Sequence, residues 1–307
     1  MLNFAIVGCG HIEIGKAEKI GRKYNVHVYT NFSSLLLKEK NIHVAAVCTP
    51  NGLHDLHTVE ALRSGLHVIC EKPMAITVSD CKLMIGEACK ASMHLFVVKQ
   101  NRFNPPVQAV KHLLDQKKLG RIYSVHLNCI WNRGNEYYKD SWRGTMEMDG
   151  GILFTQFSHF IDLLYWMFGD IDEVKAFTSN FAHQNIIEFE DSGVACFRFK
   201  NSMLGSIHFS INSYKKNMEG SLTIIAEKGT IKIGGQYLNQ LEYQLVENTM
   251  IGNLPNANSA NDYGAYQGSM SNHDKIYDHV TEVILHNGVN RFNGNDGLKT
   301  VEIIGKI

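Results

Sequence analysis

Residues 43–54 read HVAAVCTPNGLH, and this stretch decides the fold of the chain. Its first half is almost entirely apolar, which is typical of a strand whose two faces are both covered by helices. It then passes through Thr49, Pro50 and Asn51 into a helical pattern over residues 53–64. A buried strand that leads directly into a helix is the repeating unit of a parallel α/β sheet.

The same alternation of strand and helix extends along the chain to about residue 98. Helical patterns separate predicted strands at residues 2–7, 26–30, 43–49, 66–70 and 94–98. Strands that alternate with helices in this way predict a parallel sheet. We therefore expect an α/β domain over residues 1–100.

The pattern changes after residue 100, where a helix at residues 105–118 leads to a strand at residues 121–131. Further β-rich segments follow without helices between them, at residues 173–179, 192–200, 203–211 and 221–233. Consecutive strands predict an antiparallel sheet. We therefore expect an α+β domain over residues 101–307, with a large, open and mostly antiparallel sheet.

The end of the chain combines a loop with helices. Residues 250–272 are rich in Asn, Gly and Ser and are predicted to form one long loop. Helical patterns follow at residues 273–286 and 296–306. A loop of that length is more often functional than idle.

Composition excludes some partners. The chain has 307 residues with 30 basic and 30 acidic side chains, so its formal net charge of zero gives no electrostatic case for nucleic acid or an anionic membrane. No apolar stretch reaches the roughly 18 residues of a membrane span. Its 7 cysteines form no C-x-x-C motif, and no basic leader precedes the first predicted strand, so we expect a cytoplasmic protein. We expect no metal, because His54 and His57 lack further ligands nearby.

The first predicted strand ends in Gly8-Cys9-Gly10, the opening of a dinucleotide-binding turn. Glycines there let backbone N–H groups approach a pyrophosphate at a helix N-terminus. The motif is incomplete, because Glu13 replaces the third glycine and residues 27–31 contain no carboxylate for a ribose. By itself the turn therefore fits either a nucleotide site or a simple strand turn.

Glu71-Lys72-Pro73 follows the predicted strand at residues 66–70. Ligands of open α/β sheets bind at the carboxyl ends of the strands, so Lys72 is expected to face the cofactor crevice. Pro73 keeps Lys72 out of the helical region and restricts the direction of its ammonium group.

A polar stripe lies on the otherwise apolar helix predicted at residues 152–168. Thr155, Gln156, His159 and Asp162 are three or four residues apart and share one side of that helix. A histidine in this setting is a candidate ligand-facing group, and Asp162 is placed to orient its imidazole.

Arginines and aromatic residues gather between the two regions. They occur in the runs KQNR at 99–102, WNR at 131–133, YY at 137–138 and WRGT at 142–145. Arginine makes bidentate contacts to phosphate or carboxylate, and aromatic rings give faces for a base or a sugar. These runs together predict an anionic substrate that carries a ring.

The motifs together resemble those of the Gfo/Idh/MocA family of sugar oxidoreductases, and the likeness covers essentially the whole chain. GCG at 8–10, TPNGLH at 49–54, EKP at 71–73 and the helix from Gly150-Gly151 to His159 occur in the family's order. Within the family the chain is most similar to WlbA-type UDP-N-acetylglucosaminuronate 3-dehydrogenases. That likeness lies in KQNRFNPP at 99–106, WNR at 131–133, GILFTQFSH at 151–159 and GSMSNHDK at 268–275.

The resemblance implies a Rossmann domain that binds NAD and a C-terminal domain whose open sheet joins copies of the chain into a homo-oligomer. It also implies that Lys72 and His159 form the catalytic pair at the C3 hydroxyl of a UDP-sugar acid, in the synthesis of surface-polysaccharide sugars. The implied cofactor-binding residues are Gly8, Gly10, His11, Ile12, Thr49, Pro50, Asn51, His54, Glu71, Lys72, Pro73 and Gln100. The implied substrate-binding residues are Lys99, Asn101, Arg133, Tyr138, Arg143, Thr155, Gln156 and His159.

The N-terminal domain departs from the family. Residues 16–32 look like the family's second helix and third strand, so the first helix and second strand of a normal βαβ unit would be missing near Ile12-Glu13. The alternative is a divergent first helix, with Thr30 or Asn31 in place of the ribose-binding acid. A helix directly after Gly10 and a strand beside the first strand would distinguish the two.

Three functions remain open from the sequence. The first is NAD-dependent oxidation of the C3 hydroxyl of UDP-N-acetylglucosaminuronate. The second is a catalytically impaired relative that binds a UDP-sugar or a partner. The third is a dehydrogenase of the same family for another sugar or polyol, against which Arg133 and Arg143 argue because neutral polyols need no diphosphate clamp.

Overall fold

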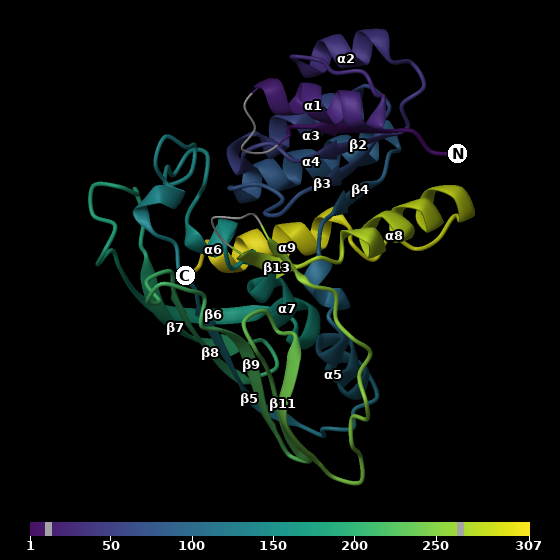
Figure 1. Cartoon of the computed structure of the whole chain (residues 1–307). Coiled ribbons are helices and arrows are strands. Elements are labelled where there is room, and N and C mark those ends of the chain that lie inside the picture. Colours follow the sequence, from purple (N-terminus) through teal and green to yellow (C-terminus); the bar gives the residue numbers. More distant parts are fainter. Residues whose placement is uncertain (10–13, 263–266) are drawn as a thin grey trace. The chain divides into compact units, whose positions relative to one another are not determined.

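The computed structural model describes residues 1–9, 14–262 and 267–307 (Figure 1). The chain divides into two compact units. The first unit consists of Met1–Val98 with His279–Val301, and the second of Lys99–Asp278 with Glu302–Ile307. Among the described residues, no helix is long and apolar enough to cross a membrane.

The first unit contains a parallel sheet, as predicted, with four strands among the described residues. Its strands lie in the order β1 (Phe4–Val7), β2 (Val44–Val47), β3 (His67–Cys70) and β4 (Leu95–Val97). Its helices are α1 (Ile14–Tyr24), α2 (Phe32–Lys38), the 3-10 turn η1 (Asn51–Leu53), α3 (His54–Arg63) and α4 (Val78–Ala91). Every residue of β2 is buried, which explains why the sequence there is a continuous apolar run.

β1 is the outer strand of this sheet in the part of the chain that the structure describes. Its side chains alternate, so that Ala5 and Val7 are buried while Phe4 and Ile6 are 38% and 57% exposed. α1 follows the glycine turn at Ile14, but no described strand pairs with the outer edge of β1. The second strand of a complete Rossmann unit is therefore absent from the described residues.

The strand predicted at residues 26–30 is wrong. The amide of Val26 donates to the carbonyl of Gly21 and closes the end of α1. Asn31 then caps α2, because its side chain accepts a hydrogen bond from the amide of Ser34. The alternating apolar residues between these two helix ends resemble a strand, but they serve as a short connection.

The other edge of the sheet is completed by residues from near the C-terminus. The amide of Val97 donates to the carbonyl of Phe292 at 2.7 Å, and the side chain of Asn290 donates to the carbonyl of Leu95 at 3.0 Å. A Cβ on Gly297 would lie 2.6 Å from the sulfur of Met74. Two helices, α8 (His273–His286) and α9 (Gly294–Ile304), flank this segment.

The second unit contains a seven-stranded sheet, drawn mainly in teal and green in Figure 1. Its strands lie in the order β11 (Gln240–Val246), β10 (Gly229–Gly234), β9 (Glu219–Ala226), β5 (Ile122–Ile130), β8 (Leu204–Ser210), β7 (Ser192–Phe199) and β6 (Ile171–Ser179). All neighbours are antiparallel except β5 and β8. The prediction of a large, mostly antiparallel sheet is therefore confirmed.

Three details of this unit differ from the prediction. The strand expected at residues 221–233 is two strands, β9 and β10, because the chain reverses between Ala226 and Gly229. β11 was not predicted at all. The loop expected at residues 250–272 contains a small hairpin of β12 (Ala260–Asp262) and β13 (Gln267–Met270), whose polar composition concealed its pairing.

The second unit contains short helices, two of which carry the polar stripe. They are η2 (Gln100–Phe103), α5 (Pro105–Asp115), η3 (Asn135–Tyr137), α6 (Ile152–Thr155) and α7 (Ser158–Phe168). The continuous helix predicted at residues 152–168 is interrupted, because Phe157 leaves the helical conformation with φ −112° and ψ 3°. η2 packs against α7, and the ring of Phe160 in α7 packs on Gly220 in β9.

Candidate active site

The turn after β1 passes close to the segment after β2. Gly8 has φ +89°, and a Cβ at this position would lie 2.6 Å from Cγ2 of Thr49. The amide of Cys48 donates to the carbonyl of Val7 at 2.8 Å. Glycine is therefore required here by both its conformation and its small size. Gly10, His11 and Ile12, the other residues predicted for this turn, lie outside the described residues.

His54 joins the segments that follow β2 and β3. Its imidazole is buried, with Nδ1 2.7 Å from the carbonyl oxygen of Pro73 and Nε2 2.9 Å from that of Thr49. Burial lowers the pKa of His54, and the two backbone hydrogen bonds oppose that effect only in part. The residue thus has a clear architectural role, while its predicted contact with the cofactor stays a prediction.

Lys72 lies at the carboxyl end of β3, as expected. Its side chain is half-buried, its amide donates to the carboxylate of Glu71 at 3.2 Å, and the Lys72–Pro73 peptide bond is cis. Residues 49–51 follow the neighbouring strand β2. The structure therefore gathers the described candidates of the first unit at the edge where open α/β sheets bind ligands.

In the second unit, Asp162 is the anion of a buried ion-pair cluster. Its carboxylate lies 2.8 Å from Nζ of Lys99 and 2.7 Å from Nη2 of Arg102, and its second oxygen accepts from Nε of Arg102 at 2.8 Å. Burial raises the pKa of Asp162, but the charges and hydrogen bonds of Arg102 and Lys99 outweigh it and lower the pKa to about 2. The expected role of Asp162 in orienting His159 stays a prediction.

Two cations share this one carboxylate, and all three side chains are no more than 3% exposed. Two positive charges thus lie beside one carboxylate in a place that water barely reaches. Such a place favours an anionic ligand, because Coulomb interactions strengthen as the local dielectric falls. Lys99 was predicted to bind substrate, whereas no role was predicted for Arg102 beyond its place in the same run.

Several buried side-chain amides have at least one atom without a hydrogen-bond partner among the described residues. Within the described residues, neither amide atom of Asn101 has a partner although the side chain is 2% exposed, and the same holds for Oε1 of Gln156 and Oε1 of Gln100. A buried polar group left unsatisfied costs about 1–3 kcal/mol. Buried amides of this kind are suited to bind a polar ligand. The buried hydroxyl of Ser158 also has no hydrogen-bond partner among the described residues. Ser158 was not among the site residues predicted from the sequence, although it directly precedes His159.

An aromatic ring lies between two guanidinium groups. The ring centroid of Tyr137 is 5.3 Å from the guanidinium carbon of Arg133 and 4.5 Å from that of Arg143. The hydroxyl of Tyr137 accepts from Nε2 of Gln156 at 3.2 Å. These residues belong to one cluster, in which the sequence singled out Tyr138 and missed Tyr137 as the central ring. Tyr138 is buried and packs edge-on against Tyr137, with centroids 4.9 Å apart.

Two buried side chains, His183 and Asp191, support the backbone of Arg133. Nε2 of His183 donates to the carbonyl of Arg133 at 2.8 Å, and Nδ1 lies 3.1 Å from the carboxylate of Asp191. Burial raises the pKa of Asp191, but hydrogen bonds, led by that from the amide of Ala182, outweigh it and lower the pKa to about 2. The guanidinium itself donates to the side chain of Asn217 at 3.1 Å.

Thr155 and His159 lie on consecutive helices, α6 and α7. The hydroxyl of Thr155 donates to the carboxylate of Asp149, which also accepts from the amide of Gly144 at 2.8 Å. Gly150 and Gly151 follow with φ of 84° and 126°. His159 is buried at the beginning of α7, in the part of the unit where η2 packs.

Comparison with known proteins gives the family. Residues 2–99 match the oxidoreductase family with an NAD-binding Rossmann fold, and residues 107–232 match the GFO/IDH/MocA C-terminal domain. Among solved structures, the WlbA dehydrogenase from Bordetella pertussis, in complex with NADH and UDP-GlcNAcA, is 31% identical, with a TM-score of 0.87 over 100% of this chain and 95% of that one. WlbA from Chromobacterium violaceum, with the same ligands, is also 31% identical, with a TM-score of 0.87 over 99% and 92% of the two chains.

A relative of different activity matches over a shorter region. The 1-carboxy-3-chloro-3,4-dihydroxycyclohexa-1,5-diene dehydrogenase of Comamonas testosteroni is 30% identical over 171 residues, which are 52% of this chain and 42% of that protein. The chain thus spans less than half the length of this relative.

The chain belongs to the GFO/IDH/MocA family of oxidoreductases and carries the NAD-binding Rossmann domain of that family. Its likeness to the WlbA dehydrogenases over nearly the whole of both chains puts it among the NAD-dependent sugar oxidoreductases of the family.

Proposed function

We propose that the protein oxidises the C3 hydroxyl of UDP-N-acetylglucosaminuronate with NAD, in the synthesis of surface-polysaccharide sugars. The observation that carries this proposal is the buried ion-pair cluster of Lys99, Arg102 and Asp162 beside unsatisfied amides. A sugar acid offers a carboxylate to the side chains of Lys99 and Arg102, and hydroxyl and acetamido groups to the amides.

The Arg133, Tyr137 and Arg143 cluster supports a substrate with a diphosphate. Guanidinium groups bind phosphate oxygens through fixed pairs of N–H donors. Stacking on Tyr137 holds the two groups in place before a ligand arrives, which reduces the entropy lost on binding. The WlbA dehydrogenases that resemble this chain were crystallised with UDP-GlcNAcA, a ligand of that kind.

The residues at the carboxyl edge of the first sheet fit NAD. Gly8 leaves the turn after β1 free of a side chain, and α1 begins shortly after it, so a helix N-terminus is available for a pyrophosphate. Thr49, Asn51 and Glu71 provide polar groups at the ends of β2 and β3. When bound, NAD accepts the hydride that leaves the carbon undergoing oxidation.

Lys72 and His159 would handle the proton of that carbon's hydroxyl. One of them removes it as a general base, and the other donates a hydrogen bond to the same oxygen. For the base to act, it must be neutral, and a lysine next to a positively charged nicotinamide ring has its pKa lowered. Burial of His159 in the second unit keeps water away from its imidazole.

Steady-state kinetics test the proposal. The purified protein with UDP-N-acetylglucosaminuronate and NAD should develop the absorbance of reduced nicotinamide. Lys72→Met and His159→Asn should each lower kcat by about 100-fold or more. Lys82→Met, a substitution of an exposed lysine in α4, serves as the control and should retain full activity. A protein that binds UDP and NAD but forms no NADH would instead be the binding-only relative.

We also propose a homo-oligomer formed through the open sheet of the second unit. Large apolar side chains on several of its strands are exposed, including Phe177 at 81%, Leu245 at 67% and Leu204 at 54%. Exposed apolar groups in such number mark interaction surfaces. Light scattering should give a multiple of the 34.6 kDa chain mass, and Phe177→Asp with Leu204→Asp should give a monomer.

A further inference from the structure

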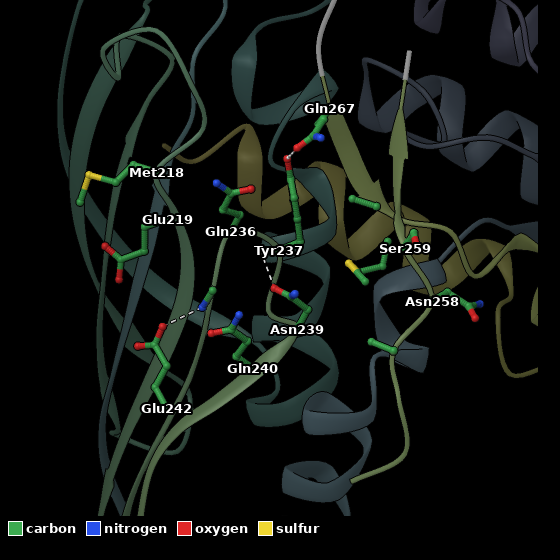
Figure 2. A pocket seen from close by; sticks show the side chains of 14 residues that line it. Met218, Glu219, Gln236, Tyr237, Asn239, Gln240, Glu242, Asn258, Ser259 and Gln267 are labelled. Carbon is green, nitrogen blue, oxygen red and sulfur yellow. Dashed lines mark hydrogen bonds between the residues drawn. The ribbon is translucent and has the colours of Figure 1, made fainter. Parts of the chain in front are cut away.

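A polar pocket opens in the second unit, with a volume of about 700 Å³ (Figure 2). One wall is formed by Met218 and Glu219 at the start of β9, and another by residues 235–242 between β10 and β11. Residues 257–260 with Gln267 and Met270 form the opposite wall. A volume of this size fits a drug-sized ligand rather than a single water or ion.

The pocket shares a wall with the segment that carries Arg133. The carbonyl of Gln267 accepts from Nη2 of Arg133 at 3.4 Å and from Nδ2 of Asn217 at 3.3 Å. The hydroxyl of Tyr237 accepts from Asn217 at 3.0 Å. It also donates to Oε1 of Gln267 at 3.4 Å, as Figure 2 shows. A ligand in the pocket would therefore lie one residue away from the guanidinium of Arg133.

The lining is rich in amides. Gln236, Asn239, Gln240, Asn258 and Gln267 all line the pocket, together with Tyr237 and two methionines. Each amide offers both a donor and an acceptor, which is the requirement for pairing with the N3–H and the two carbonyls of a uracil. Tyrosine and methionine supply the apolar contact that the faces of a base need.

Two carboxylates, those of Glu219 and Glu242, line the pocket. Nζ of Lys232 lies 2.8 Å from the carboxylate of Glu242 and 3.4 Å from that of Glu219, so one cation serves two anions. The remaining negative charge disfavours phosphate and favours hydroxyl donors, as carboxylates do when they bind ribose in dinucleotide sites. Arg133 at the shared wall has the opposite charge. The carboxylates therefore favour the nucleoside, whereas Arg133 favours its phosphates.

We propose that this pocket binds the uridine end of the nucleotide sugar, with its diphosphate directed to Arg133. This inference rests on the proposed function, because it assigns a second part of the same substrate. Its ribose hydroxyls donate to Glu242 or Glu219, and its uracil pairs with the amides around Gln240. The pocket thereby selects a pyrimidine nucleotide, while the ion-pair cluster of Lys99, Arg102 and Asp162 binds the sugar acid.

Calorimetric titration with UDP tests this assignment directly. Gln240→Ala and Glu242→Gln should each weaken UDP binding about fivefold to tenfold, the loss expected for one or two hydrogen bonds. Glu247→Gln is the matched control, because Glu247 pairs with Lys228 at 3.5 Å on the same hairpin but does not line the pocket. Affinity for inorganic pyrophosphate should be unchanged in all three variants. In turnover, the pocket variants should raise KM for the UDP-sugar without a change in kcat.

The outcomes separate this inference from the proposed function. Unchanged UDP affinity in both pocket variants would overturn the uridine assignment, even if the wild type oxidises the UDP-sugar. Weakened UDP binding in the variants, with a wild type that forms no NADH, would keep the assignment and reject the dehydrogenase. A wild type that binds no UDP would reject both. Gln240 is exposed, so its variant should fold even if that of Glu242 does not.

Discussion

The two units hold their candidate sites with different kinds of interaction. In the first unit, the neutral carbonyls of Thr49 and Pro73 meet at His54, whose pKa is lowered chiefly by burial. In the second unit, His183 lies against a carboxylate, and Asp162 binds two cations. We therefore expect the contacts of His54 to be sensitive to mild acid and to changes in side-chain size nearby. The buried ion-pair cluster around Asp162 should instead be sensitive to the loss of one charge.

The largest effect is expected from Asp162→Asn. Removal of this carboxylate leaves Lys99 and Arg102 as buried cations without their anion, which should lower the free energy of unfolding by about 3–5 kcal/mol. Urea unfolding followed by tryptophan fluorescence measures this, because Trp131, Trp142 and Trp166 all lie in the second unit. Asp170→Asn, at a more exposed ion pair with Lys200, should cost less than about 1 kcal/mol. Equal losses in the two variants would contradict the ionic account.

Gly8→Ala tests the first unit by adding a Cβ atom without changing any charge. The new Cβ combines an unfavourable positive φ with a contact of 2.6 Å to Thr49, so we expect a loss of about 2–4 kcal/mol. Gly65→Ala is the matched control, because Gly65 has φ +79° but no atom within 4 Å of its Cβ position. It should cost only the conformational part, about 1–2 kcal/mol. Circular dichroism detects both, and identical losses would show that the contact with Thr49 is unimportant.

Asp191→Asn should have a smaller effect on stability and a specific one on binding. The variant weakens the support behind His183 and the carbonyl of Arg133, at a cost of about 1–3 kcal/mol. Because Arg133 would lose its fixed position, UDP affinity should fall while NAD affinity stays the same. Asp172→Asn, an exposed change in β6, is the control. Loss of NAD binding along with UDP binding would indicate general unfolding.

The two units should lose stability at different pH values as the solution is acidified. The lowered pKa of His54 means that the unfolded chain takes up a proton at higher pH than the folded unit, so stability is lost as the pH falls below about 6.5. Asp162 and Asp191, with folded pKa values of about 2, lose their contribution only below their ordinary value of 3.8. Between pH 6.5 and 4, circular dichroism should therefore detect weakening that tryptophan fluorescence does not. Coincident transitions throughout would reject the distinction.

The sequence predicts the elements that depend on local patterns. β2 is recognisable as a continuous apolar run, and Lys72 can be located because it follows a strand end. Tyr137 and Tyr138 are adjacent and chemically alike, so only the direction of each side chain reveals which one lies between Arg133 and Arg143.

Other features depend on contacts between distant residues. His183 acts on Arg133 from 50 residues away, and neither residue lies in a pattern that links them. The apolar alternation at residues 26–30 predicted a strand, but strand formation needs a partner edge as well as a pattern. The hairpin of β12 and β13 is the opposite case. Its polar composition predicted a loop, yet its residues pair as strands.

The segment that borders β4 determines when the first unit can complete its sheet during synthesis. Phe292 and Asn290 complete the hydrogen bonds of Val97 and Leu95, so the sheet of the first unit needs residues synthesised almost 200 positions later. When the ribosome has just passed Val98, the four strands have been synthesised but the segment that borders them has not. The first unit is thus begun first, yet its sheet can be completed only after Asn290 and Phe292 have been translated, near the end of the chain.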